Sequence, residues 1–130
     1  MLEIWHFSCC QDWNPGHNGS MSTGHANSIP DMLSRLETMV LMGMDLPLAA
    51  IRGQIAHGLD LFVHLGRLRD HSRKVLDIRE VCGLKEGEIV LNALFTFHET
   101  EEKDGIIRGG WEKKGSLQNT EKLKNQGLNL

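Results

Sequence analysis

The sequence predicts a mixed α/β fold in which two consecutive helices precede an antiparallel β-meander, followed by a poorly ordered tail. Two observations support this prediction. Apolar residues recur with helical spacing between residues 29 and 57, and the spacing changes to an alternation between residues 60 and 98. The connections between the predicted strands are too short for a crossover, so neighbouring strands are expected to run antiparallel.

The first helix is expected over residues 29–42. Ser28 is a favourable N-cap residue, Pro30 fits the first turn, and Gly43 is a favourable end. Between these positions the apolar side chains fall on one stripe that would face a core. The stripe consists of Met32, Leu33, Leu36, Met39 and Val40.

The second helix is expected over residues 47–57, with Asp45 as its cap and Gly58 as its end. Its inward side chains would be Leu48, Ile51 and Ile55. The methionine-rich run between the two helices is interpreted as core filling rather than as a groove for a partner. It contains Met39, Met42 and Met44.

Three strands are expected after the helices, over residues 61–65, 75–82 and 89–97. The first is apolar at almost every position, which is typical of a strand that is buried on both faces. The third alternates cleanly between apolar and polar side chains. Turns are expected at 69–72 and 83–87, where charged residues and glycines gather.

The remaining parts of the chain carry weaker patterns. Residues 1–13 form an atypical N-terminal segment, residues 14–98 form the folded unit, and residues 99–130 form a polar C-terminal extension. Within this extension, residues 99–105 are expected to be a charged loop, and a short helix is expected near 120–125.

The composition limits the partners and the cellular compartment that the protein can have. The formal net charge is −3, from 14 basic and 17 acidic residues, which argues against nucleic acid as a partner. No apolar stretch reaches the roughly 18 residues of a membrane-spanning helix, and the N-terminus lacks the features of a secretory signal. We therefore expect a cytoplasmic protein. The cysteines Cys9, Cys10 and Cys82 fit that compartment, since an odd number is a poor disulfide framework.

One segment stands out chemically, the stretch Gly16-His-Asn-Gly-Ser-Met-Ser-Thr-Gly-His-Ala-Asn-Ser28. His17 and His25 bracket glycines and hydroxyl residues, a combination that lets backbone approach a ligand and offers donors to phosphate oxygens. Residues 18–25 are expected to form a strand followed by a loop. The small and hydroxyl residues between the histidines are Gly19, Ser20, Ser22, Thr23 and Gly24.

This segment resembles the histidine box of the secretion-and-pilus traffic ATPases, especially the CpaF-type branch that powers type II/IV secretion and Flp (Tad) pilus assembly. Further blocks resemble the family in the same order. They are Ser34–Met42, Leu46–Arg52 and Asp60–Arg69, with Leu117–Lys124 in the tail. The resemblance covers most of residues 14–98 and implies that they are the C-terminal part of a RecA-like P-loop NTPase domain.

The resemblance also implies roles for single residues. His25 would face the γ-phosphate of ATP as the catalytic residue, and the remaining residues of the box would contact the nucleotide. This second group consists of His17, Ser22, Thr23 and Gly24. The complete family enzyme uses ATP and Mg²⁺, assembles as a hexamer, and acts on an inner-membrane platform protein. A cytoplasmic location, peripheral to the inner membrane, follows from that role.

The family's phosphate loop and acidic Walker B strand have no counterpart in this sequence, which contains no Gly-x-x-x-x-Gly-Lys-Ser/Thr. We interpret the chain as a C-terminal part of such an ATPase, from a truncated, split or frameshifted gene, and expect no cofactor for the isolated chain. The alternatives are a catalytically inactive interaction remnant and the product of a decaying gene.

Simpler interpretations of the histidines stay open. His25 could merely close a junction between strand, loop and helix, and His17 could be structural. The spacing of His57, His64 and His71 suggests a metal site, but one would end a helix, one would lie within a strand and one in a turn. Metal-ligand pairs usually share one local element, so no metal site is expected.

Overall fold

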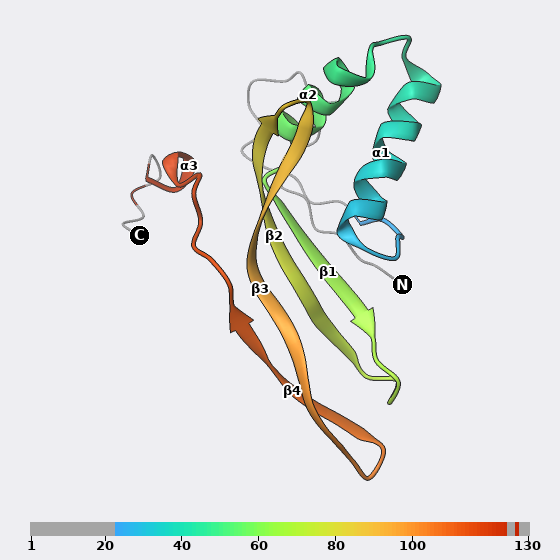
Figure 1. Ribbon diagram of the computed structural model, residues 1–130, viewed down its shortest axis with the longest axis vertical. Helices are drawn as coiled ribbons and strands as arrows, with labels where there is room; N and C mark the ends of the chain where they lie inside the picture. Colours follow the sequence, from blue (N-terminus) through green and yellow to red (C-terminus); the bar gives the residue numbers. More distant parts are fainter. Residues whose placement is uncertain (1–22, 125–126, 128–130) are drawn as a thin grey trace.

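The computed structural model describes residues 23–124 and residue 127, and the account below concerns these residues (Figure 1). The elements are α1 (Ile29–Gly43), α2 (Leu48–Gly58), β1 (Leu61–Arg67), β2 (Arg73–Lys85), β3 (Glu88–Lys103), β4 (Ile106–Lys113) and α3 (Glu121–Lys124). The strands form one sheet in the order β1-β2-β3-β4, and all neighbouring strands are antiparallel.

The predicted order of two helices followed by an antiparallel meander is confirmed. The described residues are α+β in class rather than α/β, because the helices precede the strands and no strand pair is parallel. The short helix expected near 120–125 is also present, as α3. The RecA-like assignment remains a prediction.

Helix α1 begins as the sequence predicts. The Ser28 hydroxyl oxygen accepts a hydrogen bond from the Asp31 backbone N–H at 3.2 Å, and the Asp31 carboxylate accepts one from the Asn27 N–H at 2.9 Å. Pro30 occupies the first turn, where its missing N–H costs nothing. The reciprocal bonds satisfy donors that a helix start leaves unpaired.

Helix α2 begins differently from the prediction. Its N-cap residue is Pro47, and no side chain makes a capping hydrogen bond. The expected cap by Asp45 is therefore wrong, because the helix starts at Leu48 and Asp45 lies two residues before the cap position. Burial of Ile51 and Ile55 on its inner face stabilises α2 in place of a capping hydrogen bond.

The core lies where α1 and α2 meet the end of the sheet that carries the β2–β3 turn (Figure 1). Its largest fully buried members in this region are Ile29, Ile51 and Phe62. Burying a side chain of this size contributes roughly 1.5–3 kcal/mol. The other buried apolar residues of the cluster are Ala26, Met32, Leu33, Ile55, Leu59 and Val81.

Arg52 ties the helices to the sheet at this end. Its Nε donates to Glu37 of α1 at 2.9 Å, and its Nη1 donates to Glu88 at 2.9 Å and to the Gly87 carbonyl oxygen at 3.1 Å. One guanidinium therefore joins α1, α2 and the β2–β3 turn. The hydrogen bonds to Glu37 and Glu88 raise the pKa of Arg52, so the charge persists at all relevant pH values.

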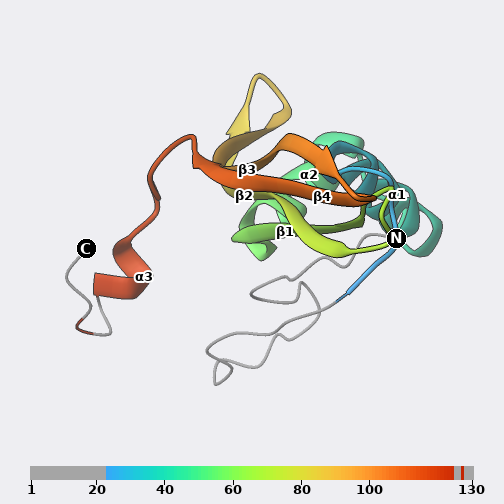
Figure 2. The same ribbon diagram turned by 90° about the horizontal axis from the view of Figure 1, so that it is seen from below.

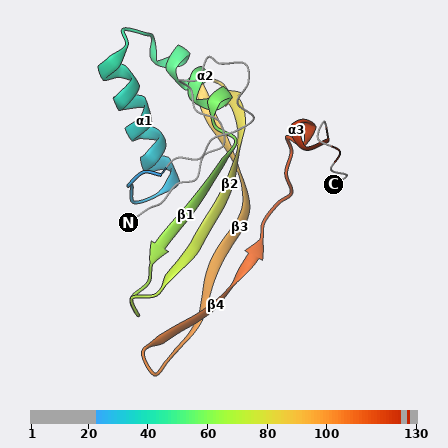
Figure 3. The ribbon, with the colours of Figure 1, turned by 180° about the vertical axis from the view of Figure 1, so that it is seen from behind.

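The charged loop expected over residues 99–105 is wrong. Strand β3 continues to Lys103, and β4 follows a two-residue turn formed by Asp104 and Gly105, whose φ angles are 53° and 73°. This is the Asp-Gly signature of a tight hairpin. The hairpin extends beyond the region that the helices cover (Figure 3), so its side chains need no apolar alternation.

Ion pairs from the β1–β2 turn and from β4 hold the acidic residues of this hairpin. Arg69 Nη2 lies 2.9 Å from Glu99 Oε2 and 3.3 Å from Glu102 Oε2, while Arg108 Nη1 lies 3.8 Å from Glu101 Oε1. The charged run that suggested a loop is thus paired within the sheet. The tail that was expected to be poorly ordered instead contributes β4.

The expectation that the methionine run fills the core is also wrong. Met39, Met42 and Met44 are 58%, 84% and 52% exposed, because they lie at the far corner between α1 and α2. Among the described residues no single helix is long and apolar enough to cross a membrane, although α1 and α2 together, bent by 120° at their junction, pass that test by length and composition.

After β4 the chain crosses back over the sheet as a C-terminal strap, defined here as residues 114–119. The Lys114 N–H donates to the Leu94 carbonyl oxygen at 2.8 Å. A Cβ at Gly115 would lie 2.8 Å from the Ala93 carbonyl oxygen, so only glycine allows this close approach. Figure 2 shows the segment running from β4 to α3.

Glu80 of β2 anchors the strap. Its carboxylate accepts the backbone N–H groups of Gln118, at 2.9 and 3.1 Å, and of Asn119, at 2.7 Å. The Asn92 amide donates to Glu80 at 3.1 Å and to the Ser116 carbonyl oxygen at 2.9 Å. Glu80 is 3% exposed, and it points away from the helix-facing core because its neighbour Val81 belongs to that core.

Candidate functional site

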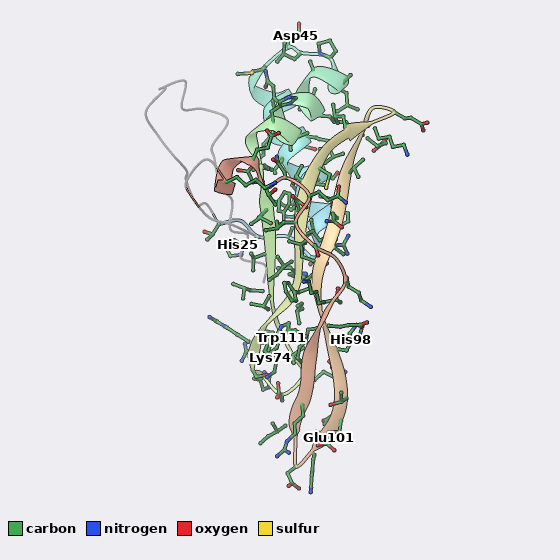
Figure 4. All side chains as sticks on the ribbon, turned by 90° about the vertical axis from the view of Figure 1, so that its left-hand side faces the viewer. His25, Asp45, Lys74, His98, Glu101 and Trp111 are labelled. Atoms are coloured by element: carbon green, nitrogen blue, oxygen red, sulfur yellow. The ribbon has the colours of Figure 1, made fainter. Side chains whose placement is uncertain are left out.

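His25 lies on the segment that leads into α1. Residues 23–26 have no regular secondary structure, which fits the loop that was expected to follow a strand within residues 18–25. Residues 18–22 lie outside the described residues. The His25 side chain is exposed, and Figure 4 shows it at the surface, far from the hairpin residue Glu101. His17 and Ser22 lie outside the described residues.

Arg35 of α1 and the close packing of Gly24 hold this segment in place. Arg35 Nη1 donates to the His25 carbonyl oxygen at 3.1 Å, which fixes the backbone while leaving the imidazole available. A Cβ at Gly24 would lie 2.6 Å from Met32 Cε, so glycine allows the backbone to pass over the buried start of α1. Thr23 next to it is exposed. Three of the five predicted site residues are therefore described, and they are consecutive.

A cleft of about 540 Å³ opens beside this segment. This volume is in the range of small-molecule sites. Its floor is apolar, from α1, Leu59 and Phe62 of β1, and its rim carries His25 and hydroxyl groups. The lining residues are Thr23, Gly24, His25, Met32, Ser34, Arg35, Leu36, Thr38, Met39, Leu59 and Phe62.

The charges around the cleft are largely compensated. Arg35 Nε lies 3.3 Å from Asp31 Oδ2, four residues earlier on the same helix. The guanidinium therefore already has a carboxylate partner and a carbonyl partner. Among residues 23–124 and 127, no three His, Cys, Asp or Glu side chains are grouped so that they could hold a metal ion.

The other histidines are placed as the sequence predicts. His57 lies at the end of α2, where its Nδ1 is 2.8 Å from the Gly53 carbonyl oxygen, His64 lies within β1, and His71 lies in the β1–β2 turn. Burial lowers the pKa of His64, although the neighbouring Asp77 carboxylate opposes this effect. These three side chains belong to separate elements and form no common site.

The described residues fit one contact to a phosphate group rather than a complete nucleotide site. The His25 imidazole and the Thr23 hydroxyl can each donate a hydrogen bond. A phosphate cradle also requires successive backbone N–H groups and a lysine. Among the described residues, no lysine lines this cleft.

The apolar half of the cleft was not anticipated from the sequence. Leu59 and Phe62 carry only the signal of core residues, and spacing along the chain cannot reveal that α1 stands opposite β1. In the sequence, Arg35 carries no signal beyond its place on the polar side of the predicted helix. Its hydrogen bond to the His25 carbonyl oxygen spans ten residues and depends on how the loop folds back.

The sequence is similar over part of its length to proteins named for conjugal transfer. It is 30% identical over 91 residues to the probable conjugal transfer protein TrbB of Sinorhizobium fredii, which covers 70% of this chain and 27% of that protein. It is 29% identical over 85 residues to proteins of two Mycobacterium tuberculosis strains that are named for conjugal transfer, covering 65% of this chain and 23% of each. No known family profile matches the chain.

The chain thus shares distant, partial similarity with conjugal transfer proteins, and it spans about a quarter of the length of these relatives. The similarity concerns the sequence of this part alone.

Proposed function

We propose that this chain is the part of a secretion or conjugation ATPase that carries the histidine box, and that His25 contacts the γ-phosphate of ATP held by the rest of the complete enzyme. The complete enzyme would be a cytoplasmic hexamer, peripheral to the inner membrane, which drives conjugal transfer, type II/IV secretion or Flp (Tad) pilus assembly through a membrane platform protein.

One observation carries this proposal. The His25 imidazole is exposed at the rim of a cleft while its own backbone is fixed by Arg35 and by the capped start of α1. A side chain that senses a phosphate must be accessible, yet it must also be held, because positioning supplies much of the catalytic effect. The similarity to conjugal transfer proteins agrees with this role.

ATP and Mg²⁺ would be held mainly by residues outside this chain. ATP supplies the phosphoryl group, and Mg²⁺ neutralises charge on its phosphate oxygens. Residues of this chain would contribute the His25 imidazole and the Thr23 hydroxyl as hydrogen-bond donors, while Gly24 lets the backbone pass close to Met32. Imidazole suits this position, because its charge can respond to a nearby phosphate near neutral pH.

A chimaera tests the proposal. The 91 matching residues of the Sinorhizobium fredii relative are replaced by those of this chain, and ATP turnover and ATP affinity are measured with and without His25→Ala. We expect kcat to fall by about 10²–10³, as for other single donors that stabilise a transition state. The Kd for ATP should change by no more than roughly threefold, since the contact matters most in the transition state.

His57→Ala is the matched control. His57 is also exposed, but it lies at the end of α2, where its Nδ1 is 2.8 Å from the Gly53 carbonyl oxygen of its own helix. This variant should keep kcat unchanged. If His25→Ala leaves kcat unchanged as well, His25 has no part in turnover and the proposal fails.

A second candidate is a catalytically inactive interaction module that binds complete ATPase subunits. The apolar cleft favours it, since Met39 of α1, which is 58% exposed, lies at this cleft beside the buried core residues Leu59 and Phe62. The same chimaera separates the two functions. An inactive module would bind subunits of the relative when added to them and would lower their ATP turnover, but it would not support turnover when it replaces the matching residues.

A further inference from the structure

One buried carboxylate oxygen of β2 has no hydrogen-bond donor. The Asp77 side chain is 13% exposed, and its Oδ2 accepts a hydrogen bond from Arg79 Nε at 2.7 Å. Its Oδ1 is buried and, within the described part of the chain, is the one buried side-chain oxygen or nitrogen without a partner. Buried acceptors are nearly always paired, because an unpaired one costs free energy. A donor for this oxygen is therefore expected.

The register of the sheet places His64 directly opposite Asp77. These two residues are partners in the antiparallel pairing of β1 with β2, and two positions along the strands Phe62 is the partner of Arg79. Directly opposite side chains share one face of a sheet, with their Cβ atoms about 4.5–5.5 Å apart. The half-buried His64 and its partner thus lie on the face that carries Phe62 into the helix-facing core.

The charges around the His64 imidazole also connect it with Asp77. Burial lowers the pKa of the imidazole, the Asp77 carboxylate raises it, and the positive charges of the amino terminus and of Arg79 lower it again. An opposite charge favours the ionised form in this way when it lies within about 4–6 Å. The ring therefore takes up its proton below the ordinary histidine value of about 6.5, next to a carboxylate that favours the cation.

We propose that the protonated His64 ring donates an N–H to Asp77 Oδ1 and thereby latches β1 to β2. The proton comes from solvent, and a change of side-chain rotamer brings the ring to the residue opposite it. Both ring nitrogens of the protonated imidazole are donors. The structure shows the unlatched arrangement, in which Oδ1 has no partner.

The latch acts where the pairing of the two strands becomes irregular. The register shifts directly after His64 and Asp77, and Leu76 is left without a partner on β1. A bulge of this kind interrupts the ladder of backbone hydrogen bonds. A side-chain hydrogen bond at the last regular pair before the bulge therefore strengthens the grip of β2 on the middle of β1 when the ring is protonated.

Two other donors lie beside Asp77. Thr96 of β3 is its partner on the other side, and the threonine hydroxyl is a neutral donor. Arg79 is already engaged with the other oxygen of the same carboxylate. A hydrogen bond between ionised groups is roughly twice as strong as a neutral one, which favours the protonated imidazole over the hydroxyl.

NMR spectroscopy of the His64 ring in the 130-residue chain tests the proposal without any variant. We expect a ring N–H resonance that appears in slow exchange with solvent as the ring takes up its proton, and that is absent at pH 8. The exposed His71 in the β1–β2 turn is the internal control, and its ring N–H should stay in fast exchange. A His64 ring N–H that exchanges as fast as that of His71 at every pH would overturn the latch.

Variants identify the acceptor. Arg79→Gln removes the neighbouring cation, and in this background the proton affinity of His64 is compared with and without Asp77→Asn. We expect Asp77→Asn to lower that affinity at least tenfold, since an opposite charge at this range changes a pKa by about one unit or more. Thr96→Val in the same background is the control and should leave the affinity unchanged.

Three results from the variants would count against the latch. Equal affinities with and without the Asp77 carboxylate would show that His64 does not meet it. A tenfold difference without a protected ring N–H would reduce the interaction to charge at a distance. An effect of Thr96→Val as large as that of Asp77→Asn would assign Oδ1 to the hydroxyl. None of these measurements involves ATP, so the inference can fail while the proposed function stands.

Discussion

Removing the Glu80 carboxylate should release the C-terminal strap from the sheet. The perturbation is Glu80→Ala, in a strand whose other face packs into the helix-facing core through Val81. Glu80 accepts hydrogen bonds from the backbone amides of Gln118 and Asn119 and from the side-chain amide of Asn92. Alanine leaves the Gln118 and Asn119 amides without this acceptor, and the Asn92 amide keeps only its bond to the Ser116 carbonyl oxygen, in a region where Glu80 itself is 3% exposed.

The size of the effect follows from these contacts. A hydrogen bond to a charged group contributes about 1.5–3 kcal/mol, but the three losses do not add, because the strap can detach and expose its amides to water. We therefore expect a loss close to that of two such bonds, roughly 3–6 kcal/mol. A chain of 130 residues lies between the sizes for which each kcal/mol lowers Tm by about 4–8 °C and by about 2–4 °C, so at about 4 °C per kcal/mol we expect Tm to fall by at least about 12 °C.

The effect depends on pH with a definite sign. Burial raises the pKa of Glu80, but the hydrogen bonds from Gln118, Asn119 and Asn92 outweigh it and leave the pKa below its usual value. A carboxyl whose pKa is lowered by folding stabilises the protein above its unfolded pKa, about 4.3 for glutamate. This contribution disappears as the pH falls through the folded pKa. The wild type and Glu80→Ala should therefore converge in stability in acid.

Chemical denaturation at pH 7 measures the difference, and hydrogen exchange at Gln118 and Asn119 locates it. Glu99→Gln serves as the control, since Glu99 is an exposed glutamate of β3 that pairs only with Arg69 and should leave Tm nearly unchanged. If Glu80→Ala lowers the free energy of unfolding by less than about 1 kcal/mol, a single unmade hydrogen bond would account for it and the anchoring role would be refuted.

Two further predictions concern the hairpin and its contact with the β1–β2 turn. Gly109→Ala should destabilise the protein by about 1–3 kcal/mol, because its Cβ would meet the His98 carbonyl oxygen, whereas Gly110→Ala has open space and should keep Tm within error. Asp70 accepts hydrogen bonds from the Ser72 hydroxyl at 2.6 Å and from the Ile107 N–H at 2.9 Å, and these bonds lower its pKa to about 2. The Ile107 amide resonance should therefore titrate with a midpoint near 2 and lose its pH dependence in Asp70→Asn. A midpoint near the ordinary aspartate value would contradict this contact.

The helices and the first three strands were predictable because local rules decide them. Ser28 and Pro30 fix the start of α1, and Gly87 follows a residue in the left-handed region, as a tight hairpin requires. The fourth strand was missed because Glu99 and Glu102 look like loop residues when apolar periodicity is the guide. Their partner Arg69 lies 30 residues or more away in sequence, so the pairing is visible only in the fold.

The site was predictable in part. The accessibility of His25 followed from its position before a capped helix, whereas the cleft depends on how α1 and β1 are placed relative to each other. Glu80 gave no signal either, because a glutamate in a strand that also carries Asp77 and Arg79 resembles a solvent-facing residue. Only the fold shows that the strap covers it and supplies the backbone donors.

The measurement that tests the central claim most directly is ATP binding and Mg²⁺-dependent phosphate release by the 130-residue chain, alone and after addition of the remaining part of the Sinorhizobium fredii relative. Phosphoryl transfer depends on a phosphate loop whose backbone and lysine hold the phosphates. This sequence contains no Gly-x-x-x-x-Gly-Lys-Ser/Thr loop. We predict no release above buffer and no ATP-dependent rise in Tm for the chain alone, with nucleotide binding restored in the mixture. Robust ATP turnover by the chain alone would contradict the account.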